Sequence, residues 1–159
     1  MAKSNFYIEI RLNVCYNIFD ASVNFKKGGG IMFNEIKTEK DIQTFLEKTN
    51  QLHDGYILSA IYTNNGIKKK ESGHSYFPWM TTLTLKVLVT SIWDAIVEIE
   101  FEGLCEWQIH DTFSNIFATT LSFDDEGHIV WADVPWQTRE ELKSSSFVIA
   151  ASMKWRIVE

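Results

Sequence analysis

The sequence predicts a mainly β protein, α+β at the margin, folded as an antiparallel β-sandwich or a curved half-barrel of about ten strands with one helix near 38–50. Three observations lead to this prediction. Apolar and polar residues alternate with period two in many short segments. Clusters of glycine, asparagine and aspartate separate these segments. No regular strand–helix alternation, which a parallel sheet would need, is visible. The length of 159 residues fits a single domain over 1–159.

Five segments alternate most clearly, and each is expected to bury one face. They are residues 6–12, 19–25, 83–90, 97–102 and 147–157. Weaker patterns predict strands at 30–34, 56–63, 104–109, 116–123 and 129–134. The segment 147–157 has the longest alternation and is also apolar at Val148 and Ala150. A strand with apolar residues on both faces is expected to lie in the middle of a sheet.

The helix near 38–50 is predicted from its N-cap and its apolar stripe. Thr38 can cap the first turn. The apolar residues at positions i, i+3 and i+4 lie on one face of a helix: Ile42, Phe45 and Leu46. A second, shorter helix is predicted to start at Thr138, with Glu141 completing a capping box. The lysine-rich stretch 68–73 is predicted to be a mobile loop.

Composition excludes several classes of protein. Hydrophobic residues make up 45% of the chain and charged residues 23%, as in ordinary globular domains. No apolar run reaches the roughly 20 residues of a membrane span, and the first residues do not resemble a signal peptide. Cys15 and Cys105 have no ligand spacing. A disulfide between them stays open, but without an export signal we expect reduced cysteines and a cytoplasmic protein that does not bind a membrane.

Charge is distributed unevenly along the chain. The net charge is −6, and residues 87–138 hold ten acidic side chains with no lysine or arginine. This pattern argues against nucleic acid as a partner, because phosphate binding needs clustered cations, and it permits a basic protein partner. Four acids of this window are candidate partner-binding residues: Glu98, Glu100, Glu102 and Glu106. In the other interpretation, Lys154 and Arg156 lie opposite them on a neighbouring strand and neutralise the row.

Two further groups of residues are candidate sites. His53-Asp54 and His110-Asp111 repeat a His-Asp pair, but adjacent strand residues point to opposite faces and the spacing matches no metal signature. We therefore expect neither a metal nor a cofactor. Trp131 and Trp136 flank a proline at a strand end, where paired tryptophans can form an aromatic binding surface. The alternative site for a small ligand therefore combines four residues: His53, Asp54, Trp131 and Trp136.

Four runs together resemble a group of small, uncharacterised bacterial β-rich domains with an HD-x-x-I segment, some of which are similar to polymorphic-toxin immunity proteins. The runs begin with Leu52-His53-Asp54-Gly55-Tyr56-Ile57 and include Phe101-Glu102-Gly103. They continue with Ile129-Val130-Trp131-Ala132-Asp133 and Met153-Lys154-Trp155-Arg156-Ile157. The resemblance covers about residues 52–158 and implies a compact bacterial protein that works by binding. It carries no catalytic residues.

These observations favour a non-enzymatic cytoplasmic binding protein, immunity-like in form, that acts through an acidic sheet surface. The alternative function is a small-ligand-binding or hydrolytic protein that uses the His53, Asp54, Trp131 and Trp136 region. A third hypothesis is a homodimer formed through a sheet edge. No nucleophile motif, phosphate-binding loop or other catalytic pattern occurs in the sequence.

Overall fold

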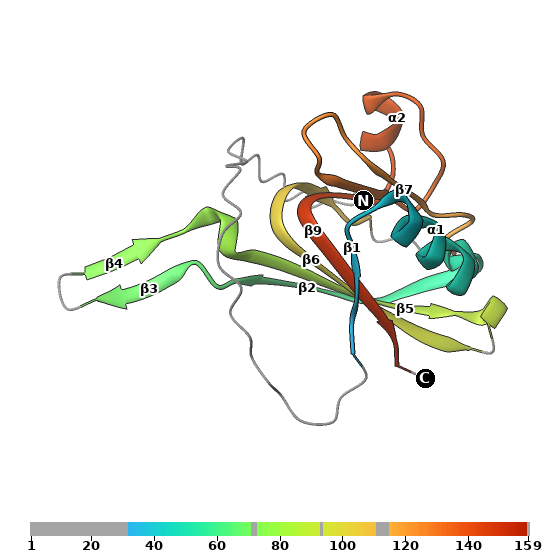
Figure 1. Ribbon diagram of the computed structural model, residues 1–159, viewed down its shortest axis with the longest axis horizontal. Helices are drawn as coiled ribbons and strands as arrows, with labels where there is room; N and C mark the ends of the chain where they lie inside the picture. The colour runs from blue at the N-terminus through green and yellow to red at the C-terminus, as the bar shows by residue number, and fades with distance from the viewer. Residues whose placement is uncertain (1–31, 71–72, 93, 111–114, 159) are drawn as a thin grey trace, which may run out of the picture.

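The computed structural model describes residues 32–70, 73–92, 94–110 and 115–158. The predicted strands at 6–12 and 19–25, like Cys15 and Asp111, lie outside these residues. Cys105 is disulfide-bonded, so the expectation that it is reduced is wrong. One antiparallel sheet has the order β2-β5-β6-β9-β8-β7, with β1 beside β9 (Figure 1). Its strands are β1 (Asn34–Ile36), β2 (Gly55–Asn64), β5 (Thr81–Val89), β6 (Ala95–Gln108), β7 (Thr120–Phe123), β8 (Ile129–Ala132) and β9 (Phe147–Ile157).

The prediction of a mainly β protein is confirmed. The described strands form a single seven-stranded sheet and a separate two-stranded hairpin, so neither a sandwich of two packed sheets nor a set of ten strands is confirmed. The sheet curves strongly at β6 and β9 without closing into a barrel (Figure 1). No helix among the described residues is long and apolar enough to cross a bilayer.

A bulge and a glycine bend the centre of the sheet. The sequence suggests two strands at 97–102 and 104–109, but β6 runs through both. Gly103 has a φ of +66°, and the register with β9 shifts between Leu104 and Glu106. A bulge of this kind bends the strand and increases its twist without ending it. The bend explains why the alternation changes phase here although the strand continues.

β9 occupies the middle of the sheet, with the bounds that its alternation predicts. It pairs with β6 along one side. Along its other side it pairs first with β8, over 147–150, and then with β1, over 153–155. The expectation that this strand is central is therefore confirmed.

The main hydrophobic core lies between the sheet and helix α1 (Glu39–Lys48). Thr38 caps the start of this helix, as predicted, and forms a reciprocal capping box with Asp41. Ile42 and Phe45 are fully buried. The ring of Phe45 meets that of Trp155 edge-on, with centroids 5.3 Å apart. The predicted apolar stripe thus seats the helix on β9.

A second, smaller cluster lies between the curved part of the sheet and helix α2 (Arg139–Lys143). The predicted capping box of Thr138 and Glu141 is present. Leu142 is buried against Val130 and Phe147. Three short 3-10 helices complete the described structure: Asn50–Leu52, Pro78–Met80 and Thr90–Ile92.

The prediction of a mobile loop at 68–73 is wrong. Strands β3 (Ile67–Lys70) and β4 (Gly73–Tyr76) form a hairpin, in which Ile67 pairs with Tyr76 and Lys70 with Gly73. Figure 1 shows this hairpin extending away from the main sheet. Its residues show no apolar alternation because it does not cover the core, and backbone pairing alone does not leave a hydrophobic pattern in a sequence.

Two other strands are shifted relative to the predictions. β1 begins at Asn34, where the sequence suggested 30–34, and β7 covers only the end of the predicted 116–123 segment. Ile116 instead forms an isolated bridge with Gly55 at the start of β2.

Candidate functional site

The row of glutamates on β6 is paired with cations on β9. Glu98 lies opposite Arg156, with Oε1 2.9 Å from Nη2. The ammonium of Lys154 lies 2.9 Å from Glu100 and 2.6 Å from Glu102. The interpretation in which Lys154 and Arg156 neutralise the row is therefore confirmed in its geometry. Such pairing offsets the repulsion between three carboxylates on one face.

Local electrostatics hold Lys154 in its charged form. Partial burial of its ammonium acts to lower the pKa, but hydrogen bonds and charge attraction from Glu102 and Glu100 outweigh this effect. The pKa of Lys154 is consequently raised above the ordinary value for lysine. The ring of Phe33 lies over the same cations, 4.3 Å from the Arg156 guanidinium carbon and 5.4 Å from the Lys154 ammonium.

Glu106, the fourth candidate acid, lies on the same strand beyond the bulge. Its carboxylate forms an ion pair with Arg139 at the start of α2. All four candidate acids thus have a cationic neighbour within the chain. Their exposure differs, however: 13% of the Glu98 side chain is accessible and 46% of that of Glu102. Glu102 is the member of the row that an external partner can reach most easily.

A cavity of about 470 Å³ opens beside Glu102, at an interruption in the pairing of β9. Pairing with β8 ends at Ala150 and pairing with β1 begins at Met153. Ala151 and Ser152 have no partner strand on this side among the described residues. We call this cavity the β9 groove. Its lining consists of Glu35, Ile36, Lys37, Glu102, Phe123, Gly127, Ala151, Ser152, Met153 and Lys154.

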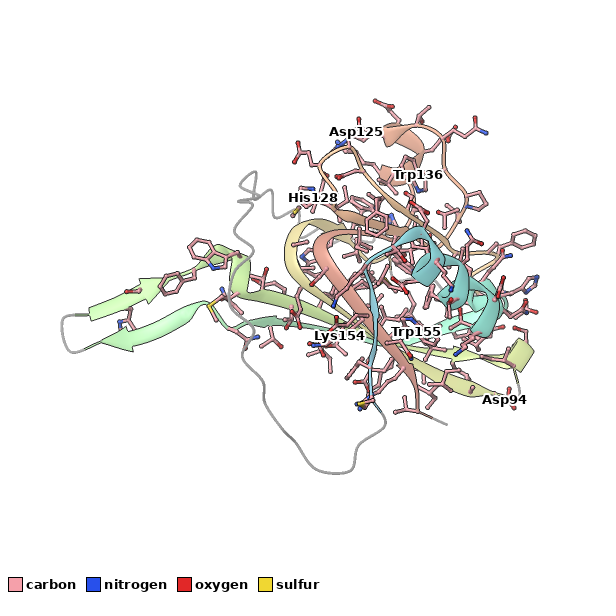
Figure 2. All side chains as sticks on the ribbon, in the orientation of Figure 1. Asp94, Asp125, His128, Trp136, Lys154 and Trp155 are labelled. Atoms are coloured by element: carbon pink, nitrogen blue, oxygen red, sulfur yellow. The ribbon has the colours of Figure 1, made fainter. Side chains whose placement is uncertain are left out.

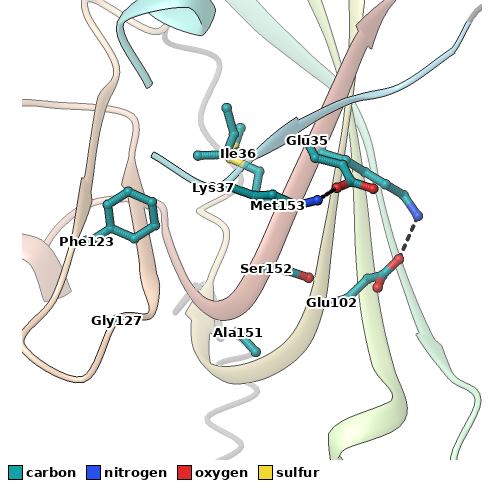
Figure 3. A pocket seen from close by; sticks show the side chains of 10 residues that line it. Glu35, Ile36, Lys37, Glu102, Phe123, Gly127, Ala151, Ser152 and Met153 are labelled. Atoms are coloured by element: carbon teal, nitrogen blue, oxygen red, sulfur yellow. Dashed lines mark hydrogen bonds and ion pairs between the residues drawn. The ribbon is translucent and has the colours of Figure 1, made fainter. Parts of the chain in front are cut away.

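The floor of the β9 groove is apolar and its rim is charged. Ile36 and Met153 are almost completely buried beneath it, and Phe123 forms the wall on the side of β7. Figure 3 shows Phe123 on one side of the groove and Glu102 on the other, with Ser152 between them. A groove of this size and polarity fits a small ligand or one or two residues of an extended chain.

The charge around the β9 groove is negative in sum. The two lysines of the rim are balanced by ion pairs, Lys37 with Glu35 and Lys154 with the β6 glutamates. The turn between β7 and β8 adds Asp125, which is exposed, and Glu126, whose side chain is 74% exposed. The rim therefore presents more carboxylates than cations to solvent.

The β7–β8 turn is fixed by its own hydrogen bonds. The Asp124 carboxylate accepts from the backbone N–H groups of Glu126 (3.0 Å) and His128 (2.8 Å). Its second oxygen lies 3.1 Å from Nδ1 of the buried His128 ring. This arrangement holds Gly127 in place at the edge of the β9 groove.

His53 and Asp54 lie elsewhere, in the turn between α1 and β2. Asp54 has a φ of +56° and accepts from the Asn115 amide at 2.8 Å. The His53 carbonyl accepts from Ser91 at 2.6 Å. These contacts fasten the turn to two neighbouring loops. His110 forms a hydrogen bond with Gln108. The described residues contain no group of three His, Cys, Asp or Glu side chains that could hold a metal ion.

The two candidate tryptophans are in different surroundings. Trp131 is fully buried on β8, packs against Phe101, and its indole N–H has no hydrogen-bond partner among the described residues. Trp136 packs against the smaller cluster, beside α2 (Figure 2). Neither residue lines the β9 groove, and neither do His53 and Asp54. The structure does not bring these four residues together at that cavity.

Sequence reasoning found Glu102 and Lys154 but missed the groove between them. β8 and β1 pair with the same side of β9 and leave a gap between them, which forms the groove. The apolar alternation of β9 continues through this gap and so does not reveal it. The local signal is Ala151, a small residue in the apolar series of β9, which the structure shows to be exposed.

Comparisons with protein-family models, with curated proteins and with solved structures find no match to this chain. The resemblance to HD-x-x-I domains and immunity proteins stays an expectation.

Proposed function

We propose that this chain is a non-enzymatic, cytoplasmic binding protein, and that its β9 groove receives an extended, positively charged segment of a partner protein. The observation that carries the proposal is the position of the groove: a cavity with an apolar floor and an acidic rim, in the gap between the β8 and β1 pairings along one side of β9.

The backbone of β9 supports binding of an extended segment. Strands add to sheets by hydrogen-bonding to backbone groups that have no strand partner, while pockets receive alternate side chains. Ala151 and Ser152 offer such a short stretch between β8 and β1. An aliphatic side chain of the bound segment would lie on Ile36 and Met153.

The charge of the rim supports a basic partner. Lys37 and Lys154 pair with Glu35 and Glu102, so the excess negative charge of the rim comes from the exposed Asp125 and Glu126. A negative rim increases the association rate of a cationic segment, most strongly at low salt. The charged groups of the groove form ion pairs with one another. This arrangement suits recognition of a partner more than proton transfer. An immunity-like role, in which the partner is a basic toxin domain, is the form of this proposal that the sequence resemblance suggests.

The proposal can be tested with a defined probe. We expect a fluorescein-labelled ten-residue peptide of alternating lysine and valine to bind the full chain, measured by fluorescence anisotropy at low salt. A peptide of alternating glutamate and valine should bind at least tenfold more weakly. Ala151→Tyr, which fills the groove, should weaken binding of the lysine peptide tenfold or more. Glu35→Lys with Glu126→Lys should do the same by reversing the rim charge.

Glu140→Lys is the matched control, because Glu140 is exposed on α2 and does not line the groove. It should leave the affinity within about twofold of that of the unchanged chain. Equal binding of the lysine peptide to Ala151→Tyr and to the unchanged chain would contradict the proposed site. Each variant is first compared with the unchanged chain by thermal unfolding, so that a folding defect is not read as a binding defect.

A further inference from the structure

β2 is the outermost strand of the sheet at the end opposite β7. Its outer side is bridged at Gly55 by Ile116, and no other described strand pairs there. The ten residues of β2 contain neither a charged residue nor a proline. Edge strands of monomeric proteins usually carry such residues because an open edge pairs with other chains. β2 has no such protection beyond a register shift near its start.

Large apolar side chains are exposed along this edge. Tyr56, Leu58, Ile61 and Tyr62 are 43%, 54%, 54% and 39% exposed. Just beyond the end of β2, Ile67 is 61% exposed. These five residues account for most of the exposed large hydrophobic side chains among the described residues. We call them, with the backbone of β2, the β2 edge.

We propose that the β2 edge pairs with the β2 edge of a second copy of this chain, forming a two-fold symmetric dimer with a continuous antiparallel sheet. A strand is complementary to itself in the antiparallel orientation, because the two-fold axis presents each backbone donor to an acceptor of the other copy. The absence of charge from β2 removes the repulsion that would oppose this pairing and also removes any preference for a charged partner.

Side-chain size selects the register. The register with β5 shifts between Ile57 and Ser59, which leaves residues 59–64 as the regular part of the strand. Directly opposed residues of two neighbouring strands point to the same face of the sheet. The two-fold axis must therefore lie midway between one residue of β2 and the same residue of the second copy. An axis at Ile61 places Ala60 opposite Tyr62 of the second copy, twice by symmetry. The small side chain thereby leaves room for the large one, and the two Ile61 side chains meet at the centre.

The same register accounts for the exposure at both ends of the β2 edge. It places Asn64 opposite Leu58 of the second copy, so that the neighbouring Ile67 lies along the exposed start of the other strand. The five side chains expose on the order of 500 Å² per copy, taking about 200 Å² for each large side chain. With the backbone strip added, this area reaches the low end of standard interfaces, roughly 600 Å² per partner.

The test uses the full chain in two experiments. Sedimentation over a range of concentrations should give a species of twice the 18.4 kDa chain mass, and Ile61→Lys should convert it to a monomer with at least a tenfold weaker dimerisation constant. Ile61→Cys should form a covalent dimer on oxidation, because opposed Cα atoms lie roughly 4.5–5.5 Å apart. Asp125→Cys, exposed in the turn between β7 and β8 at the opposite end of the sheet, controls for chance collisions.

Three results would overturn the proposal. One is a monomer at the highest concentration. Another is a dimer unaffected by Ile61→Lys. The third is equal crosslinking of the two cysteine variants. The lysine-peptide affinity of the β9 groove should be the same in Ile61→Lys, so failure of the dimer and failure of the groove can be told apart.

Discussion

Arg156 on β9 and Glu98 on β6 lie directly opposite each other in the sheet, with Nη2 2.9 Å from Oε1. Glu98 is the least exposed of the paired glutamates, at 13% of its side chain. Replacing Glu98 removes a charged hydrogen bond between two partly buried side chains, whereas the Glu106–Arg139 pair has a cation that is 64% exposed. The two pairs therefore provide a matched comparison of an inner and an outer ion pair.

Glu98→Gln should lower the free energy of unfolding by about 1–3 kcal/mol, because a hydrogen bond to a charged group is lost in a partly buried site. Glu106→Gln should lower it by less than about 1 kcal/mol, since solvent screens the outer pair. Urea unfolding at neutral pH measures both values. Equal effects of the two substitutions would contradict the assignment of different roles to the two pairs.

Ending the chain after Ser146 should abolish cooperative folding. The truncation removes the strand that pairs with β6, β8 and β1 and exposes Val97, Ile99 and Phe101, which are fully buried. Circular dichroism and thermal unfolding of the purified fragment provide the measurement. A cooperative melt of the fragment would show that β9 is dispensable.

Asp133→Asn should stabilise the protein relative to the unchanged chain, and increasingly so as the pH rises. Burial raises the pKa of the Asp133 carboxyl, and hydrogen bonds from Ser146 only partly offset this. Above the ordinary pKa near 3.9, the folded state therefore binds more protons than the unfolded state. The contribution of Asp133 is fully present below that pH and is lost as the pH rises through the raised value.

Denaturant unfolding of both proteins between pH 3 and pH 7 provides the measurement for Asp133. Asparagine keeps an oxygen that can accept from the Ser146 N–H, which the carboxylate does at 3.1 Å. A stability difference that is constant with pH would contradict the assignment.

Gly103→Ala should be more destabilising than Gly127→Ala. Both glycines have a left-handed backbone, with φ of +66° and +84°, which costs about 1–2 kcal/mol for alanine. At Gly103 the new Cβ would also lie 2.9 Å from the Ala151 Cβ, whereas nothing lies within 4 Å at Gly127. We expect a further 1–3 kcal/mol for this overpacking. Thermal unfolding of the two variants tests the order, and the reverse order would contradict it.

The sequence allows prediction of those features that depend on local periodicity. The eleven-residue alternation of 147–157 predicts the bounds of β9, and the capping residues Thr38 and Thr138 predict both helix starts. The shared parity of Glu98 and Arg156 predicts their ion pair once the two strands are neighbours. In each case the pattern lies within one helix or strand and repeats with the period of that element.

Features that depend on where strands end relative to one another could not be predicted. The β9 groove lies between the last residue of β9 that pairs with β8, opposite Ile129, and the first that pairs with β1, opposite Ile36. Nothing in the sequence of β8 or of β1 indicates which part of β9 it pairs with. The neighbouring Pro135 and Trp136 favour a surface position for Trp131, yet it is fully buried on β8 and packs against Phe101 of β6. Its burial depends on which strands lie beside β8, and local sequence does not specify this.

The central place of β9 also constrains how the chain acquires its fold during synthesis. β5 and β6 emerge from the ribosome before β9, and until residue 157 follows, the apolar face that they share has no strand to complete it. Because pairing of β9 with β1 joins residues more than a hundred positions apart, loop closure slows this last step. The newly made chain thus passes through an interval in which a long open sheet edge is accessible to chaperones, to other nascent chains and to proteases.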